Sequence, residues 1–194
     1  MLTSDQVIQL GEYCATLDLF NPRLNLTALT DPATQVAELV LDSLLLTRLS
    51  ADIRAARVVD IGSGGGVPGI PLAIACPGWT VELLERKSSL ALYLEEAVRR
   101  ARVLNATVLN IALEHYPFRT IRERLLFTSK AVFHVEQLCE QLTRFAPKSA
   151  QAAWWGTPGL DADSLSGDWS IEATTTATLP VTGRPTAVYL LSRE

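Results

Sequence analysis

The fold expected for this chain follows from one segment, which reads Asp60-Ile61-Gly62-Ser63-Gly64-Gly65-Gly66-Val67-Pro68-Gly69. An apolar run over residues 57–61 leads into it and predicts a buried strand, and a second apolar run over residues 70–75 predicts a helix. Glycine permits positive φ and lets a ligand approach the backbone closely. The five glycines among residues 62–69 therefore predict a ligand-binding loop, with a plain tight turn as the alternative.

Strand and helix alternate on the carboxyl side of this loop. We expect strands over residues 80–84, 106–109, 125–128 and 150–154, with helices over 90–101 and 135–142 among them. Such alternation predicts parallel βαβ units with right-handed crossovers. After a polar loop over 156–168, residues 171–179 and 186–191 predict a hairpin that turns at Gly183.

These elements predict an α/β protein with a mostly parallel seven-stranded sheet and a C-terminal antiparallel hairpin. This is the general plan of the Rossmann-like class I S-adenosylmethionine-dependent methyltransferases. In open α/β sheets a ligand lies at the carboxyl ends of the strands. We therefore expect the functional site at that edge.

Two helices are expected before the sheet. The first is capped by Ser4 or Asp5 and stops at Asn21-Pro22, and its apolar face is formed by Val7, Leu10, Cys14 and Leu17. The second opens at Asp31-Pro32 and runs to about Leu49. We expect a single domain over residues 1–194, made of an N-terminal helical cap (1–50) and an α/β core (56–194).

The acidic residues at the strand ends distinguish two classes of ligand. Gly64, Gly66 and Gly69 match the G-x-G-x-x-G pattern of dinucleotide sites, a weak signal when it stands alone. Asp60 ends the first strand, where a carboxylate would repel a pyrophosphate but attract the sulfonium and ammonium groups of S-adenosylmethionine. Glu85, at the end of the next strand, can accept the ribose hydroxyls of either ligand. Asp60 therefore favours S-adenosyl-L-methionine as the cofactor.

The composition agrees with a folded chain: 48% of the residues are hydrophobic, 20% are charged and the net charge is -4. No apolar run reaches the ~20 residues of a membrane span, and residues 1–9 do not read as a secretion signal. Three widely spaced cysteines favour reduced thiols in the cytoplasm rather than a metal site. The acidic balance argues mildly against RNA binding, although Arg99, Arg100 and Arg102 form a local cluster of cations.

With these residues placed, the chain resembles the RsmG (GidB) family over about residues 21–156. The glycine segment, continued as Ile70-Pro71-Leu72-Ala73-Ile74-Ala75, is similar to the family loop nearly residue for residue. Three shorter segments share the resemblance: Asn21-Pro22-Arg23-Leu24-Asn25-Leu26-Thr27, Leu41-Asp42-Ser43 and Ser129-Lys130-Ala131. The resemblance implies methylation of guanine N7 in the decoding region of small-subunit (16S) ribosomal RNA. The expected partner is that RNA or the assembling small subunit, and we expect a monomer.

The resemblance also implies which residues form the site. Carried over by position, the residues expected to contact S-adenosylmethionine are Gly62, Val67, Leu113, Glu114 and Lys130. To these the glycine loop and the strand ends add Asp60, Ser63, Gly64 and Glu85. Asn25, Asp42 and Ser43 would shape the cap and the mouth of the pocket on the substrate side. For Leu113, ordinary core packing is the alternative.

The chain departs from the family pattern mainly by losing cations. Glu38-Leu39 replaces an arginine-histidine pair, Ser89-Leu90 replaces lysine-arginine, and Ala112 replaces an arginine. Lys130 stands where the family has arginine, which keeps the charge but loses the bidentate fork. Two rival hypotheses follow: a catalytically silent S-adenosylmethionine-binding protein, or a methyltransferase for a non-RNA substrate.

The chemistry expected for guanine N7 requires no general base, because N7 carries a free lone pair. The enzyme must hold N7 in line with the methyl group and the sulfur at near-attack distance. We expect Lys130 to be the catalytic residue nearest to the transfer, with an ordinary lysine at a strand end as the alternative. Trp154 and Trp155 could stack on a base, although core packing is the commoner role for such residues.

Overall fold

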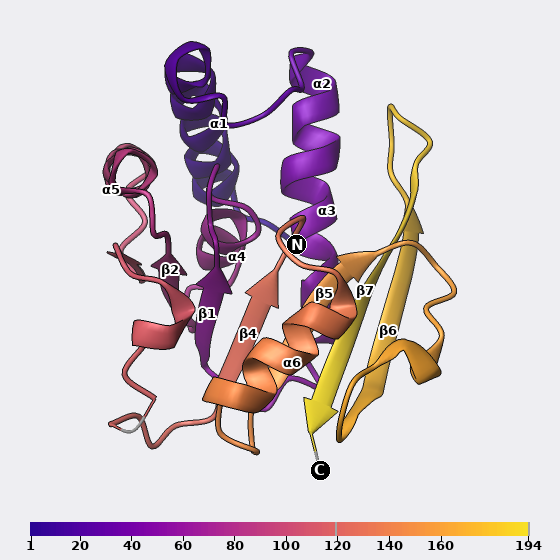
Figure 1. The fold of residues 1–194 in the computed structure, drawn as a ribbon. Helices are drawn as coiled ribbons and strands as arrows, with labels where there is room; N and C mark the ends of the chain where they lie inside the picture. Colours follow the sequence, from indigo (N-terminus) through magenta and orange to yellow (C-terminus); the bar gives the residue numbers. More distant parts are fainter. Residues whose placement is uncertain (119, 194) are drawn as a thin grey trace.

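The computed structural model describes residues 1–118 and 120–193, in which the chain forms a seven-stranded sheet (Figure 1). The strands are β1 (Arg57–Ile61), β2 (Thr80–Leu84), β3 (Ala106–Leu109), β4 (Leu125–Ser129), β5 (Gln151–Gly156), β6 (Trp169–Thr178) and β7 (Pro185–Arg193). Their order is β3-β2-β1-β4-β5-β7-β6. Strands β1 to β5 are parallel, and β7 pairs antiparallel with β5 and β6. The α/β fold with a closing hairpin is confirmed.

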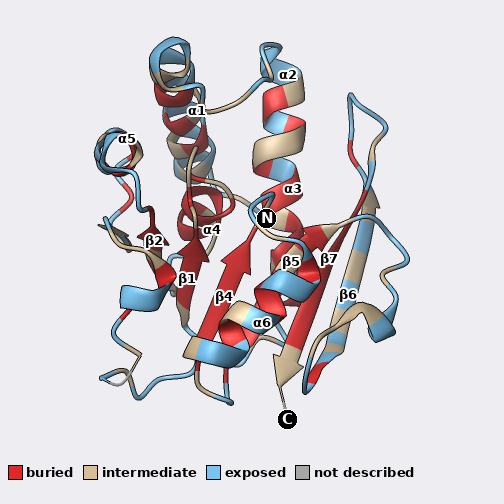
Figure 2. Ribbon diagram, viewed as in Figure 1, coloured by how far each residue is buried: buried red, intermediate tan, exposed pale blue. Residues whose placement is uncertain are grey.

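Helices cover both faces of the sheet. The main helices are α1 (Ser4–Leu24), α4 (Gly69–Ala75), α5 (Ser88–Arg100), α6 (Val135–Phe145) and a composite helix over 32–49. There are also two short 3-10 turns outside the composite helix, η3 (Leu113–His115) and η4 (Ala162–Ser164). One core cluster lies under α1, α4, α5 and the composite helix, and the other lies under α6. The central strands are accordingly buried on both sides (Figure 2).

Neighbouring residues of β1 show how the sheet divides the two clusters. Val58 packs into the cluster under the N-terminal helices and Val59 into the cluster under α6, because side chains alternate between the faces of a strand. The N-terminal helices therefore share a layer with α4 and α5. The division of the chain into a cap and a core stays a prediction. Within the described residues, no helix combines the length and the apolar character that crossing a bilayer requires.

Helix α1 differs from its predicted bounds at both ends. Its N-cap is Thr3, which forms a capping box with Gln6, so neither Ser4 nor Asp5 caps it. The helix also continues through Pro22 to Leu24. Pro22 forfeits its own amide hydrogen bond, and the amide of Asn25 still donates to the carbonyl of Asn21 at 2.9 Å. The predicted apolar face is partly wrong, since Val7 is exposed and Tyr13 is fully buried.

The composite helix begins after Asp31 and ends at Leu49, as predicted. Its parts are α2 (Pro32–Gln35), a π-helix η1 (Val36–Leu41), α3 (Asp42–Leu44) and a 3-10 turn η2 (Leu45–Leu49). In the π segment the Asp42 amide donates to the carbonyl of Ala37, five residues back. In this register the carbonyl of Glu38 does not accept from the amide of Asp42, its donor in an α-helix. The same carbonyl accepts from Lys130 Nζ.

The glycine loop, residues 62–68, joins β1 to α4, and α4 starts very close to the strands. A Cβ atom on Gly69 would lie 2.8 Å from Asp60 Oδ2 and would collide with the side chain of Leu83. A side chain at this position would push α4 away from the sheet. The close approach therefore requires glycine.

We expect Gly69→Ala to lower the free energy of unfolding by about 1–3 kcal/mol, because overpacking of a core contact has that cost. Gly11→Ala is the matched control: a Cβ on Gly11 meets nothing within 4 Å, and alanine in a helix interior should stabilise by about 0.5–1 kcal/mol. Urea unfolding measures both. Equal effects of the two substitutions would contradict the close approach of α4.

Candidate functional site

The conformation of the glycine loop depends on residues that can adopt positive φ. Gly62, Gly64 and Gly66 have φ of +68°, +47° and +95°, values that residues with a side chain rarely adopt. The amides of Gly62 and Ser63 donate to the carbonyl of Leu84 at 2.9 and 3.0 Å. The end of β2 thus fixes the start of the loop, at the carboxyl edge of the sheet where the ligand was expected.

Two buried tyrosines hold the middle of the loop. The hydroxyls of Tyr13 on α1 and Tyr93 on α5 both donate to the carbonyl of Gly65, at 2.8 and 3.1 Å. The sequence placed Tyr93 within the helix predicted over residues 90–101 and did not single out Tyr13. The available signal was the hydroxyl itself, because a buried tyrosine usually finds a polar partner.

Glu85 faces the glycine loop from the end of the neighbouring strand β2. The residue is buried, and its Oε2 accepts the amide of Gly64 at 3.1 Å while its Oε1 accepts the amide of Lys87 at 2.9 Å. These bonds hold the carboxylate at the strand end. A diol placed beside it would find a fixed acceptor.

A cavity of about 480 Å³ opens at this edge of the sheet, within the range usual for small-molecule sites. Four of the predicted cofactor residues line it: Gly62, Glu85, Leu113 and Glu114. Ile111, Val132 and Phe133 add apolar wall, and the rim includes Arg86 and Lys87. The structure therefore brings the glycine loop, Glu85 and the η3 segment together around one cavity.

A second cavity, of about 590 Å³, lies between α1 and α5 and is lined mainly by polar and charged residues, including Asp5, Glu12, Arg100 and Arg102. It lies beside the carboxyl end of α5, and therefore at the amino edge of the parallel strands. Ligands of open α/β sheets bind at the opposite edge. The position of the cavity beside Glu85, rather than its volume, thus favours it as the ligand site.

Asp60 lies below the glycine loop rather than in the cavity wall. Its carboxylate is buried, with Oδ1 accepting from the hydroxyl of Thr128 at 2.8 Å and Oδ2 from the amide of Gly69 at 3.3 Å. Burial raises the pKa of Asp60 to about 6, although these bonds oppose the rise. Its contact with a cofactor stays a prediction, and the bonds seen favour support of the loop from beneath.

Two further loop residues are also directed inward. Ser63 is buried and its hydroxyl donates to the carbonyl of Asp60 at 3.1 Å, and Val67 packs against the core cluster under the N-terminal helices. Neither lines the cavity. The contact of Ser63 and Val67 with a cofactor stays a prediction. Without a rearrangement of the side chains, only the backbone atoms of these residues could make that contact.

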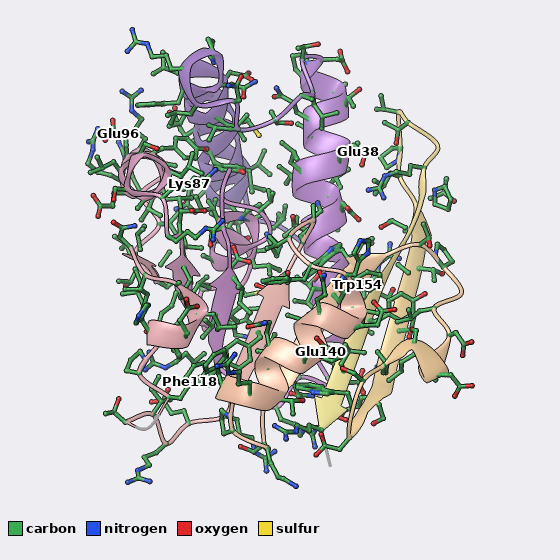
Figure 3. All side chains as sticks on the ribbon, viewed as in Figure 1. Glu38, Lys87, Glu96, Phe118, Glu140 and Trp154 are labelled. Carbon is green, nitrogen blue, oxygen red and sulfur yellow. The ribbon has the colours of Figure 1, made fainter. Side chains whose placement is uncertain are left out.

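Asp42 lies at the centre of a partly buried polar cluster made of Glu38, Asp42, Lys130, Arg184 and Thr186, in which Asp42 and Thr186 are buried and the Arg184 side chain is 41% exposed. Asp42 Oδ2 is 3.0 Å from Lys130 Nζ and 2.9 Å from Arg184 Nη2, and Asp42 Oδ1 accepts from Thr186 at 2.8 Å. Glu38, on the side of the helix toward the hairpin (Figure 3), binds the same Arg184 guanidinium. Arg184 thus supplies a cation beside the position where the family arginine is replaced by Glu38.

Lys130 is occupied by this cluster. Its Nζ donates to the carbonyl of Glu38 at 2.6 Å and pairs with Asp42, and its side chain is 11% exposed. Burial lowers the pKa of Lys130, and Asp42 opposes that shift. Lys130 does not line the cavity, so its predicted catalytic and cofactor-binding roles stay predictions that these contacts do not support.

The remaining predicted residues on the substrate side have structural contacts. The hydroxyl of Ser43 donates to the carbonyl of Leu39, and Asn25 is the exposed left-handed C-cap of α1. Asn21 instead holds the following loop, since its side chain exchanges two hydrogen bonds with the backbone of Thr27. A role of Asn25 and Ser43 at the pocket mouth stays a prediction.

Curated proteins similar to this chain share one name. A Stenotrophomonas maltophilia protein named Ribosomal RNA small subunit methyltransferase G is 45% identical over 96 residues, which are 50% of this chain and 44% of that protein. A Xylella fastidiosa protein of the same name is 40% identical over 108 residues, 56% of this chain and 50% of that protein. The chain matches about half the length of these curated relatives.

Solved structures share the fold at low identity. MtNAS in complex with MTA and tNA superposes with a TM-score of 0.64 at 13% identity, covering 97% of this chain and 71% of that chain. The putative methyltransferase yhhF from Escherichia coli superposes with a TM-score of 0.54 at 18% identity, covering 87% and 90%. These likenesses show the Rossmann-like α/β fold.

The family comparison covers the sheet and the candidate site. Residues 6–153 match the GidB family, described as rRNA small subunit methyltransferase G. The matched range includes the glycine loop, Glu85, the η3 segment and Lys130. This chain therefore belongs to the GidB family.

Proposed function

We propose that this protein is an S-adenosylmethionine-dependent methyltransferase of small-subunit ribosomal RNA, with N7 of a guanine as the methyl acceptor. The observation that carries the proposal is the cavity at the carboxyl edge, where a glycine loop with positive φ values meets the fixed carboxylate of Glu85. Membership of the GidB family supports the substrate class.

The residues around the cavity fit the chemistry of this cofactor. Glu85 can accept both ribose hydroxyls, and Ile111 and Leu113 offer apolar surface to an adenine ring. A Cβ on Gly64 would meet only the carbonyl of Gly62, at 3.7 Å, so the loop leaves open space where a ligand can approach the backbone. We assign cofactor contacts to Gly62, Gly64, Glu85, Leu113 and Glu114, with Ser63 and Val67 contributing backbone only.

The chain's part in the reaction is alignment. The bound cofactor supplies an electrophilic methyl group on a sulfonium. Guanine N7 attacks through a lone pair and has no proton to lose, so no side chain has to act as a general base. The glycine loop and Glu85 hold the donor in one orientation, and the acceptor must approach at near-attack distance from the opposite side of the methyl group.

Positive charge at the rim favours an RNA substrate over a silent binding protein. Arg86 and Lys87 are exposed and border the cavity, next to Ser89-Leu90, where the family cations are missing. Exposed cations of this kind neutralise RNA phosphates. The cluster at Arg99 and Arg100 is different, because both side chains pair with Glu96 and so form a solvated helix face.

Labelled S-adenosylmethionine should transfer methyl groups to small subunits from a strain that lacks the modification, and borohydride–aniline cleavage should then map one 7-methylguanine. Protein-free RNA and assembled subunits form separate arms. Bound cofactor without any transfer would favour the silent binding protein. Label in a non-RNA fraction would favour a different substrate.

Glu85→Gln should weaken S-adenosylmethionine binding about tenfold or more, since one charged acceptor of the ribose is replaced by an amide, a loss of roughly 1.4 kcal/mol or above. Glu140→Gln, an exposed site on α6 (Figure 3), is the matched control and should bind like the wild type. Calorimetric titration measures both. Equal affinities for the two variants would remove Glu85 from the site.

The pKa of Asp60 makes its contribution to stability depend on pH. Because its folded pKa is about 6 and the ordinary pKa of an aspartate is 3.8, the folded state binds the proton more tightly than the unfolded state. The contribution of Asp60 is therefore most favourable below pH 3.8 and is lost as pH rises to about 6. Relative to Asp60→Asn, the wild type should lose about 2 kcal/mol between pH 4 and pH 7. Urea unfolding of both proteins across this range measures the difference, and a constant difference would contradict the raised pKa.

A further inference from the structure

The connection from β4 to α6, residues 130–134, contains a backbone conformation that needs support. Ala131 has φ of +59°, in the left-handed region that favours glycine. Such a residue costs of order 1–3 kcal/mol and persists only where the surrounding structure holds it. Val132 and Phe133, the next two residues, line the candidate cofactor cavity. The contacts that hold this connection therefore determine one wall of the cavity.

The carboxyl end of the connection is fixed by β5. The Trp154 indole, which lies beside α6 (Figure 3), donates from Nε1 to the carbonyl of Phe133 at 3.0 Å. Between the ends, Val132 lies over the glycine loop, since a Cβ on Gly62 would be 3.1 Å from a methyl group of Val132. The connection thus packs directly on the first glycine of the loop.

The amino end is fixed by Lys130. Its Nζ donates to the carbonyl of Glu38 at 2.6 Å and lies 3.0 Å from Asp42 Oδ2. The π-helix makes the first bond possible, because the amide of Asp42 is directed to Ala37 and not to Glu38. Both acceptors belong to the composite helix, so one ammonium ties the connection to the N-terminal layer.

The acceptor side of this tie is itself rigid. The Asp42 carboxylate also binds Arg184, just before β7, and Thr186 in β7. Its backbone carbonyl accepts from Trp155 Nε1 of β5 at 2.9 Å, and its side chain is 2% exposed. Because Asp42 is held from the hairpin and from β5, it cannot follow Lys130 if the connection moves, so it can serve as a fixed point.

We propose that Lys130 is a positioning residue: its ammonium, held by Asp42 and the carbonyl of Glu38, anchors the connection over 130–134 and so keeps the Val132–Phe133 wall of the cavity in place. Lys130 touches neither the methyl donor nor the acceptor. This assignment rests on the proposed function only in identifying the cavity ligand as S-adenosylmethionine. It replaces the catalytic role that the sequence analysis expected for Lys130 and the cofactor contact that the family resemblance implied.

The test compares Lys130→Met and Lys130→Arg with Lys148→Met, a control lysine whose side chain is 75% exposed. Hydrogen exchange of the Trp154 indole N–H, which donates to the carbonyl of Phe133, should be about tenfold faster or more in Lys130→Met without ligand, because local opening controls exchange. Lys130→Arg should restore protection, since a guanidinium also pairs with Asp42. Lys148→Met should exchange like the wild type.

Binding and turnover separate positioning from catalysis. S-adenosylmethionine affinity should fall about fivefold to tenfold in Lys130→Met, while kcat at saturating cofactor and RNA stays within about threefold of the wild type. Unchanged exchange of the Trp154 indole N–H would overturn the anchoring role. A kcat at least a hundredfold lower, with unchanged exchange and affinity, would overturn it in favour of a catalytic lysine.

If Lys130→Met does not fold, Asp42→Asn weakens the same ion pair from the other side while it keeps an acceptor for Thr186. Faster exchange of the Trp154 indole N–H is again expected, and unchanged exchange again contradicts the proposal. The exchange measurement requires no ligand. A wild-type protein that fails to bind S-adenosylmethionine would therefore remove the proposed function and still leave the anchoring role to be decided by exchange.

Discussion

The turn from β1 into α4 depends on a carboxylate buried beneath it. Asp60 accepts from Thr128 on β4 and from the Gly69 amide at the start of α4, so one side chain joins two strands and a helix. Burial of that charge is costly, as the raised pKa shows. The cost is offset by hydrogen bonds that allow the glycine loop to pass close over the strand ends.

Support for the loop also comes from elements far away in the sequence. Tyr13 and Tyr93 bind the carbonyl of Gly65 from α1 and α5, and Glu85 binds the amide of Gly64 from β2. The loop is therefore shaped before any ligand arrives, which lowers the entropic cost of binding. The N-terminal helices contribute to the site through these contacts and through the layer they share with α5.

The charged cluster around Asp42 shows how charges can be rearranged within one fold. Glu38 and Lys130 differ from the family residues at their positions, yet both are partnered, since Arg184 binds Glu38 and Asp42 binds Lys130. A buried ion pair contributes little net stability, but the loss of one partner is expensive. The cluster thus ties the composite helix to the end of β4 and to the hairpin, and the charges of Glu38 and Asp42 are balanced by Arg184 and Lys130.

The sequence by itself determined the features that local chemistry controls. Short apolar segments predicted β1, β2 and β3 with their observed bounds. The glycine loop and Glu85 were likewise predicted at the strand ends. Both predictions succeed because the apolar pattern of a strand and the conformational freedom of glycine are properties of short segments. Only the tertiary structure decided the direction of each charged side chain. Asp60 and Lys130 face buried partners rather than the cavity, because those partners, Thr128 and Asp42, are 68 and 88 residues away and become neighbours only when the sheet is assembled.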